Sequence, residues 1–191
     1  MRVIAGSAKS LPLKTVKGDK TRPTTDRIKE TLFNMLNPYL SGCRFLDLFA
    51  GSGGIGIEAL SRGASFACFV EQSREAVRCI RENLAFTRLS GRAEVAAKDV
   101  FAFLSAAEGK PYDLVFMDPP YDHLYEKRAL ELLSENGLIH NETLLVAEAS
   151  LNTDFSYLDS LGFTVVRMKK YKTNMHLFLR VKSDAYETEL E

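Results

Sequence analysis

The sequence predicts an α/β fold in which helices cover both faces of a mainly parallel, seven-stranded sheet. From Arg44 onward, short apolar runs alternate with helical stretches. Strands that are apolar on both faces and separated by helices are typical of doubly wound sheets. A glycine-rich turn follows the first apolar run, as in folds that bind ligands at the ends of such strands. The last two runs are joined by only a few residues, which predicts antiparallel neighbours at the end of the chain.

Seven apolar runs mark the expected strands, and the helical stretches between them mark the expected helices. Strands are predicted at residues 45–49, 66–70, 93–97, 114–117, 144–147, 163–168 and 175–181. Helices are predicted at residues 55–62, 74–86, 100–107, 125–135 and 155–161.

The residues before this pattern are expected to form a small basic arm and a leading helix. Val3–Ala5 and residues 11–16 predict a β-hairpin that is too short to hold a core of its own. The helix is predicted to begin near Asp26 with a threonine cap and to end at Pro38. One side of this helix is apolar and should dock on the main domain: Ile28, Leu32, Met35 and Leu36.

Three parts of the chain are therefore expected. They are a basic β-hairpin arm at residues 1–22, one main domain with its leading helix at 23–182, and an acidic, disordered tail at 183–191. The formal net charge is zero, yet residues 1–30 carry eight basic and three acidic side chains. A basic arm on a neutral protein indicates a polyanionic partner, although a solvated surface has the same composition.

The composition argues against several other classes of protein. Cys43, Cys68 and Cys79 fit neither a disulfide framework nor a zinc-ligand spacing, and the three histidines are scattered, so no metal is expected. The N-terminus has no charged-then-apolar leader, and no apolar run approaches the roughly 18 residues of a membrane span. We therefore expect a cytoplasmic protein.

The glycine-rich turn predicts a nucleotide site, because Gly51, Gly53 and Gly56 satisfy the pattern G-x-G-x-x-G. Glu71 lies twenty residues after Gly51, at the end of the second strand, where a carboxylate can accept from ribose hydroxyls. Both NAD and S-adenosylmethionine (SAM) are compatible with these features. Asp47 favours SAM, because a carboxylate at this loop repels a pyrophosphate but attracts the ammonium of the methionine end.

A further carboxylate, Asp99, follows the third strand and is placed to accept from the adenine amine of a ligand lying across the strand ends. Capping of nearby backbone N–H groups is an alternative role for Asp47 and Asp99 taken singly. Carboxylates at several consecutive strand ends favour the ligand-binding interpretation.

The fourth strand ends in Asp118-Pro119-Pro120-Tyr121, in which two prolines fix φ at about −65° and remove two N–H donors, so the strand must stop. A strand-ending turn could have the same composition. Beside a methyl donor, however, Asp118 and the Pro119 carbonyl can accept from both hydrogens of a nucleobase amine while Tyr121 stacks on the base. No cysteine lies near this strand end, which argues against methylation at a pyrimidine C5.

With these residues in view, the chain resembles the bacterial RsmD family of class I SAM-dependent methyltransferases. The resemblance covers nearly the whole chain. Its most specific parts are Arg22-Pro23-Thr24-Thr25-Asp26-Arg27 with Lys29-Glu30 and Leu32-Phe33-Asn34, then Asp47-Leu48-Phe49-Ala50-Gly51-Ser52-Gly53, and Asp118-Pro119-Pro120-Tyr121. The resemblance implies a Rossmann-like methyltransferase sheet and methylation of the N2 amine of one guanine in 16S ribosomal RNA.

The resemblance also implies which residues form the functional site. The resemblance implies SAM contacts at Asp47, Phe49, Gly51, Ser52, Gly53, Glu71, Asp99 and Val100, and a catalytic target-amine site at Asp118, Pro119, Pro120 and Tyr121. We assign RNA contact to Lys14, Lys17, Lys20 and Arg22 in the arm, and to Lys169, Lys170 and Lys172 between the last strands. The chain departs from the family pattern at Ser10-Leu11-Pro12 and at Lys172, which leaves the details of RNA docking open.

Three other functions remain open from the residues alone. They are an amino-methyltransferase for adenine in DNA or for a glutamine side chain, a non-catalytic RNA-binding module, and an NAD-dependent enzyme. Aspartate rather than asparagine at position 118 favours a nucleobase. We expect a monomer that acts on 16S ribosomal RNA, either free or within an assembling small-subunit particle.

Overall fold

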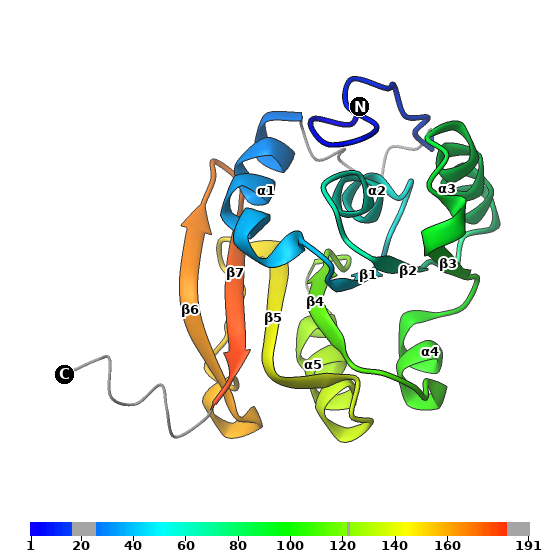
Figure 1. Ribbon diagram of the computed structural model, residues 1–191. Coiled ribbons are helices and arrows are strands. Elements are labelled where there is room, and N and C mark those ends of the chain that lie inside the picture. The colour runs from blue at the N-terminus through cyan, green and yellow to red at the C-terminus, as the bar shows by residue number, and fades with distance from the viewer. Residues whose placement is uncertain (17–25, 122, 183–191) are drawn as a thin grey trace.

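The computed structural model describes residues 1–16, 26–121 and 123–182 and shows a seven-stranded sheet in the order β3-β2-β1-β4-β5-β7-β6 (Figure 1). The strands are β1 (Arg44–Leu48), β2 (Phe66–Val70), β3 (Ala93–Ala96), β4 (Tyr112–Met117), β5 (Ile139–Ser150), β6 (Phe163–Lys170) and β7 (Asn174–Val181). β1 to β5 run parallel, whereas β7 is antiparallel to β5 and to β6. The predicted fold class, with its antiparallel end, is confirmed.

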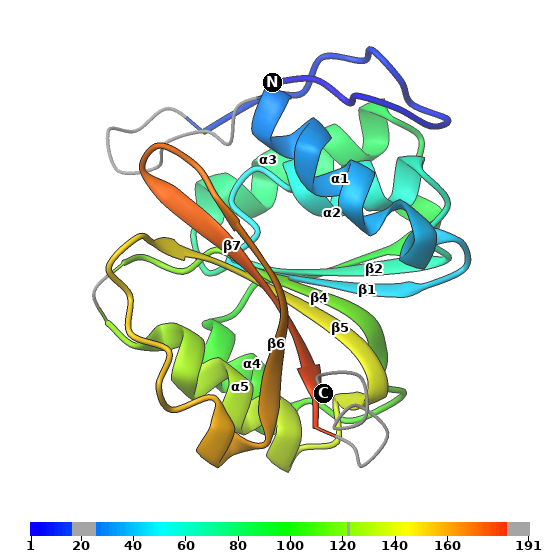
Figure 2. The same ribbon diagram turned by 90° about the vertical axis from the view of Figure 1, so that its left-hand side faces the viewer.

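Helices cover both faces of this sheet. The described part of the chain holds α1 (Asp26–Leu40), α2 (Gly54–Ser61), α3 (Arg74–Phe86), α4 (Val100–Ala106) and α5 (Tyr125–Glu135). α1, α2 and α3 lie on one face and α4 and α5 on the other (Figure 2). Successive strand residues point to opposite faces, so Phe116 joins the core under α1 and α2 while Met117 joins the core under α4 and α5. None of the helices in these ranges is long and apolar enough to cross a membrane.

The leading helix α1 is longer than predicted, because Pro38 lies inside it and the helix continues to Leu40. A proline in the last turn removes a single backbone hydrogen bond. Leu40 is only 1% exposed, so its burial holds that turn in helical form. The predicted apolar face is buried or half-buried throughout: Ile28, Leu32, Met35 and Leu36. The predicted threonine cap lies outside the described residues.

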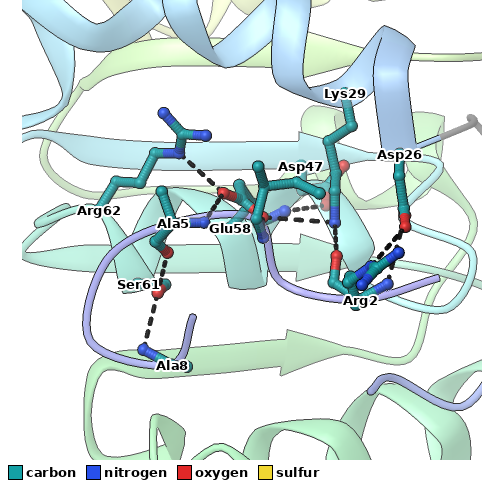
Figure 3. A network of polar contacts seen from close by, with 11 residues as sticks. Arg2, Ala5, Ala8, Asp26, Lys29, Asp47, Glu58, Ser61 and Arg62 are labelled. Carbon is teal, nitrogen blue, oxygen red and sulfur yellow. Dashed lines mark hydrogen bonds and ion pairs between the residues drawn. The ribbon is translucent and has the colours of Figure 1, made fainter. Parts of the chain in front are cut away.

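The N-terminal segment, defined here as residues 1–16, contains one antiparallel bridge between Arg2 and Pro12 in place of the two predicted strands. The reason lies in α2. Ile4 and Ala5 donate their N–H groups to the Glu58 carboxylate, at 2.8 and 3.0 Å, rather than to a partner strand (Figure 3). The segment is therefore bonded to the main sheet domain, and its remaining predicted part, residues 17–22, lies outside the described residues.

The predicted helix at residues 155–161 is wrong, since the structure has only the 3-10 turn η2 (Asp159–Leu161) there. The Asp154 carboxylate accepts from the N–H and the hydroxyl of Ser156, each at 2.9 Å, which stabilises a local turn where the first helical turn was expected. β6 also extends to Lys170, so the β6–β7 turn contains only residues 171–173. The predicted tail at 183–191 lies outside the described residues.

Candidate active site

The carboxyl ends of the parallel strands meet at one edge of the sheet, which is where doubly wound folds bind ligands. Leu48 at the end of β1 is in register with Val70 of β2 and with Met117 of β4. β7 begins at the same edge, because Asn174 pairs with Ser150 at the end of β5. The β6–β7 turn therefore lies beside the strand ends, at the upper left in Figure 2.

The glycine-rich loop joins β1 to α2, as predicted. Phe49, Gly51 and Gly53 have positive φ angles of 61°, 54° and 80°, a region that glycine adopts without strain and phenylalanine rarely enters. A Cβ on Gly53 would lie 3.2 Å from Ile80 of α3, and one on Gly56 would lie 2.3 Å from the Phe69 ring of β2. Only glycine lets the loop and α2 lie this close to β2 and α3.

Asp47 lies beneath this loop. Its side chain is 1% exposed, and its Oδ2 accepts the N–H of Gly56 at 2.9 Å. Burial raises the pKa of the Asp47 carboxyl from its ordinary value to about 7. This hydrogen bond connects β1 to α2, so Asp47 does accept from a backbone N–H group, as the alternative role requires. Its contact with the ammonium group of SAM stays a prediction.

Glu71 and Asp99 follow β2 and β3, and both carboxylates accept from backbone groups. Glu71 accepts the N–H of Gly51 at 2.9 Å and that of Ser73 at 2.8 Å, so it holds the glycine-rich loop directly. Asp99 caps α4 by accepting two N–H groups of its first turn, at 2.9 and 3.0 Å. Because a carboxylate has about four acceptor sites, both retain capacity for the predicted ribose and adenine contacts.

An aromatic group lies beside these strand ends and was not predicted as a unit. The Phe49 and Tyr125 rings stack with centroids 6.2 Å apart, and Phe101 meets Tyr125 edge-on at 5.2 Å. Val100, a predicted cofactor residue, is buried at the start of the same helix as Phe101. Flat apolar surfaces of this kind suit the ring system of a nucleobase.

Asp118-Pro119-Pro120-Tyr121 follows β4 directly, on the strand next to β1. Asp118 is half-buried, Pro119 is buried, and Pro120 and Tyr121 are exposed. The structure therefore brings the proposed amine-holding stretch and the glycine-rich loop to neighbouring strand ends, as the sequence predicted.

The surroundings of Asp118 are acidic. Burial, followed by the charges of Glu148, Asp47 and Glu126, raises the pKa of its carboxyl well above the usual range. Within the described residues, no three His, Cys, Asp or Glu side chains are grouped as metal ligands. The acidity of this site favours the protonated form of Asp118.

Sequence reasoning missed a buried polar group beside Asp118. Glu148 of β5 lies opposite His176 of β7, with 2.9 Å between Oε2 and the His176 Nε2, and it also accepts from the Asn174 amide. The Tyr171 hydroxyl lies 3.3 Å from the other ring nitrogen of His176. A glutamate inside the apolar run at 144–149 was the available signal, since a charged residue in a buried strand usually has a partner.

Four of the seven residues predicted to contact RNA lie in the described part of the chain. Lys169, Lys170 and Lys172 are exposed at the end of β6 and in the β6–β7 turn, on the edge that carries the strand ends. Lys14 forms an ion pair with Glu82 of α3 at 2.7 Å, although its side chain is 71% exposed. The other three, Lys17, Lys20 and Arg22, lie outside the described residues.

Comparison with known proteins identifies the family. The family model described as "Conserved hypothetical protein 95" matches residues 1–180. Ribosomal RNA small subunit methyltransferase D (RsmD) of Escherichia coli strain K12 is 38% identical over 79% of this chain and 75% of its own length. The chain belongs to the RsmD family.

A further curated relative and a solved structure are similar to the chain in sequence and in fold. YlbH of Bacillus subtilis strain 168 is 45% identical over 78% of this chain and 82% of its own. The solved structure of YhhF from Escherichia coli covers 96% of this chain and 99% of its own, with a TM-score of 0.83 and 32% identity. The Rossmann-like methyltransferase fold predicted for the RsmD family is thereby confirmed.

Proposed function

We propose that this protein transfers the methyl group of SAM to the exocyclic N2 amine of a guanine in 16S ribosomal RNA. One observation carries the proposal, namely that Asp118-Pro119-Pro120-Tyr121 and the glycine-rich loop after Asp47 end neighbouring strands. The name of the Escherichia coli relative supports a small-subunit ribosomal RNA as the substrate. The choice of guanine N2 rests on the family resemblance of the sequence blocks quoted above.

The cofactor is proposed to lie across the ends of β1, β2 and β3. Asp47 would meet the ammonium of its methionine end, and Glu71 would accept from its ribose hydroxyls. Asp99 would accept from the adenine amine, with the Phe49, Phe101 and Tyr125 rings beside the base.

Catalysis is proposed to depend on orientation of the amine. The lone pair of an exocyclic amine is delocalised into the ring, and acceptors on its two hydrogens localise that pair and direct it at the methyl group. Asp118 and the Pro119 carbonyl are these acceptors, while Tyr121 stacks on a base that has left its helix. As the N–C bond forms, the S–C bond of SAM breaks, S-adenosylhomocysteine leaves, and the amine proton passes to Asp118 or water.

The RNA is proposed to dock along the basic groups near this edge. Lys169, Lys170 and Lys172 would contact phosphates, which position a substrate without reading its sequence. Lys14, together with Lys17, Lys20 and Arg22, would extend this contact. We further propose that the enzyme works as a monomer in the cytoplasm, on free 16S RNA or on an assembling particle.

Incubation with labelled SAM and small-subunit RNA, either protein-free or in particles, followed by mapping of the labelled base, tests the proposal. We expect label on one guanine N2 for the wild type and none for Asp118→Ala, with SAM affinity largely retained in calorimetry. Asp154→Ala, which changes an exposed aspartate in a loop, is the matched control. Label on adenine or on protein would contradict the substrate, and wild-type turnover of Asp118→Ala would contradict the catalytic role.

A further inference from the structure

One buried amide on α3 links the N-terminal segment to the glycine-rich loop. Asn83 is 1% exposed. Its Nδ2 donates to the carbonyl of Lys14 and to the carbonyl of Ser52, each at 3.0 Å, and its Oδ1 accepts the N–H of Lys14 at 2.9 Å. The two N–H donors of this amide therefore bind two different segments of the chain. The side chain thus fixes the position of the N-terminal segment relative to the glycine-rich loop.

Neighbouring contacts join the same three parts. The carbonyl of Lys14 also lies 3.4 Å from the thiol sulfur of Cys79, one helical turn before Asn83. On the loop side, Ile80 packs against Gly53, and a Cβ on Gly54 would lie 2.6 Å from the Met1 side chain. The N-terminal segment and the loop are thus packed on one surface of α3 and on each other.

This arrangement has an energetic consequence. A buried amide that loses its partners is destabilising, so displacement of either segment would weaken the contacts of the other through Asn83. A ligand that orders one segment lowers the conformational entropy that the second ligand must remove. The two segments carry the two proposed binding surfaces, because Lys14 is a proposed RNA contact and the glycine-rich loop is the proposed cofactor site.

We propose that Asn83 is a positioning residue that couples the two ligands, so that RNA bound at the N-terminal segment tightens cofactor binding at the loop. This inference rests on the proposed function for the identity of both ligands. Thermodynamic linkage requires the effect to be reciprocal, so the cofactor tightens RNA binding by the same factor.

Calorimetry with S-adenosylhomocysteine, which binds without turnover, measures the coupling. Its dissociation constant is determined with and without saturating small-subunit RNA, for the wild type, Asn83→Ala and Glu82→Gln. Glu82 is the matched control, because it holds the Lys14 side chain at the surface but has no bond to the loop. We expect roughly tenfold tighter binding with RNA for the wild type and Glu82→Gln, and a ratio near one for Asn83→Ala.

A second measurement does not depend on the folding of any variant. Hydrogen exchange on the wild-type protein should show that S-adenosylhomocysteine slows exchange of the Lys14 and Leu13 amides, which lie in the N-terminal segment. Equal affinities with and without RNA in the wild type, a wild-type ratio in folded Asn83→Ala, or unchanged exchange would overturn the coupling. Failure of the wild type to methylate this RNA would instead overturn the proposed function.

Discussion

Lys29 Nζ and Glu58 Oε2 lie 3.3 Å apart, and neither side chain has any exposed surface. Glu58 also accepts from Arg62 Nε at 2.7 Å and from the N–H groups of Ile4 and Ala5, while Lys29 donates to the Arg2 carbonyl (Figure 3). Burial lowers the pKa of Lys29, and the Glu58 charge opposes that change. The pair thus joins α1, α2 and the N-terminal segment within the protein interior.

Replacing Lys29 by methionine should lower the free energy of unfolding by about 3 kcal/mol, because the buried Glu58 side chain loses one of its two cationic partners. Urea denaturation followed by circular dichroism measures this change. Lys127→Met is the control, since the Lys127–Glu131 pair is half-exposed and 4.0 Å long, and its loss should cost about 0.5 kcal/mol or less. Equal losses for both variants would contradict the structural role of Lys29.

Gly6 should be intolerant of alanine. It has a φ of 84°, and a Cβ there would lie 1.9 Å from the Ser61 carbonyl oxygen of α2. Gly42 has a similar φ of 74° with nothing within 4 Å, so Gly42→Ala isolates the cost of the backbone conformation. We expect losses in unfolding free energy of about 1 kcal/mol for Gly42→Ala and about 3 kcal/mol for Gly6→Ala. A difference near zero would mean that the segment moves away from α2 freely.

Binding of SAM should release a proton from Asp47. The pKa of this carboxyl is about 7 in the ligand-free protein, and a cofactor ammonium beside it would favour the charged form. Affinity should therefore rise as the pH rises from about 5 to about 7, and titrations at pH 6 in buffers of different ionisation enthalpy should show the released proton. Asp47→Asn should remove this release. The same proton count in the variant would assign the release to another group.

Glu148→Gln should shift the pH dependence of methyl transfer. Asp118 must be charged to accept well from the amine, so the rate should increase as the pH rises through its pKa. Burial is the first cause that raises this pKa and the Glu148 charge is the second. Removing that charge lowers the Asp118 pKa, so the ascending limb of kcat/KM should move to lower pH. Glu142→Gln, on the same strand with its side chain 81% exposed, should leave the limb in place. An unshifted limb for Glu148→Gln would contradict the coupling of these two carboxylates.

The sequence predicted the sheet well because its signals are local. An apolar run of five residues and a glycine-rich turn identify β1 and the loop after it without knowledge of the rest of the chain. Pro38 gave a wrong prediction of the end of α1. A proline stops a helix only where nothing buries the turn beyond it, and burial of Leu40 depends on the tertiary fold. The helix predicted at residues 155–161 is absent because their apolar spacing is also compatible with a turn that buries Leu158.

The candidate site was predictable for the residues that sit in recognisable motifs, and not for their partners. Asp47 and Asp118 are identified by the stretches around them. Glu148 and His176 are 28 positions apart and meet only when β5 pairs with β7. Asn83 resembles any polar residue in a helix until the N-terminal segment and the loop are placed against it.

The attachment of the N-terminal segment sets an order of events during synthesis. Its bonds to α2 and α3 join residues 53 to 69 positions apart, so residues 1–16 have no complete binding site until α3 has followed them out of the ribosome. At roughly 5–20 residues per second, that interval lasts seconds. Residues 1–16 are therefore placed no earlier than α3, and a bulky group fused ahead of them would act on this docking step rather than on pairing of the strands.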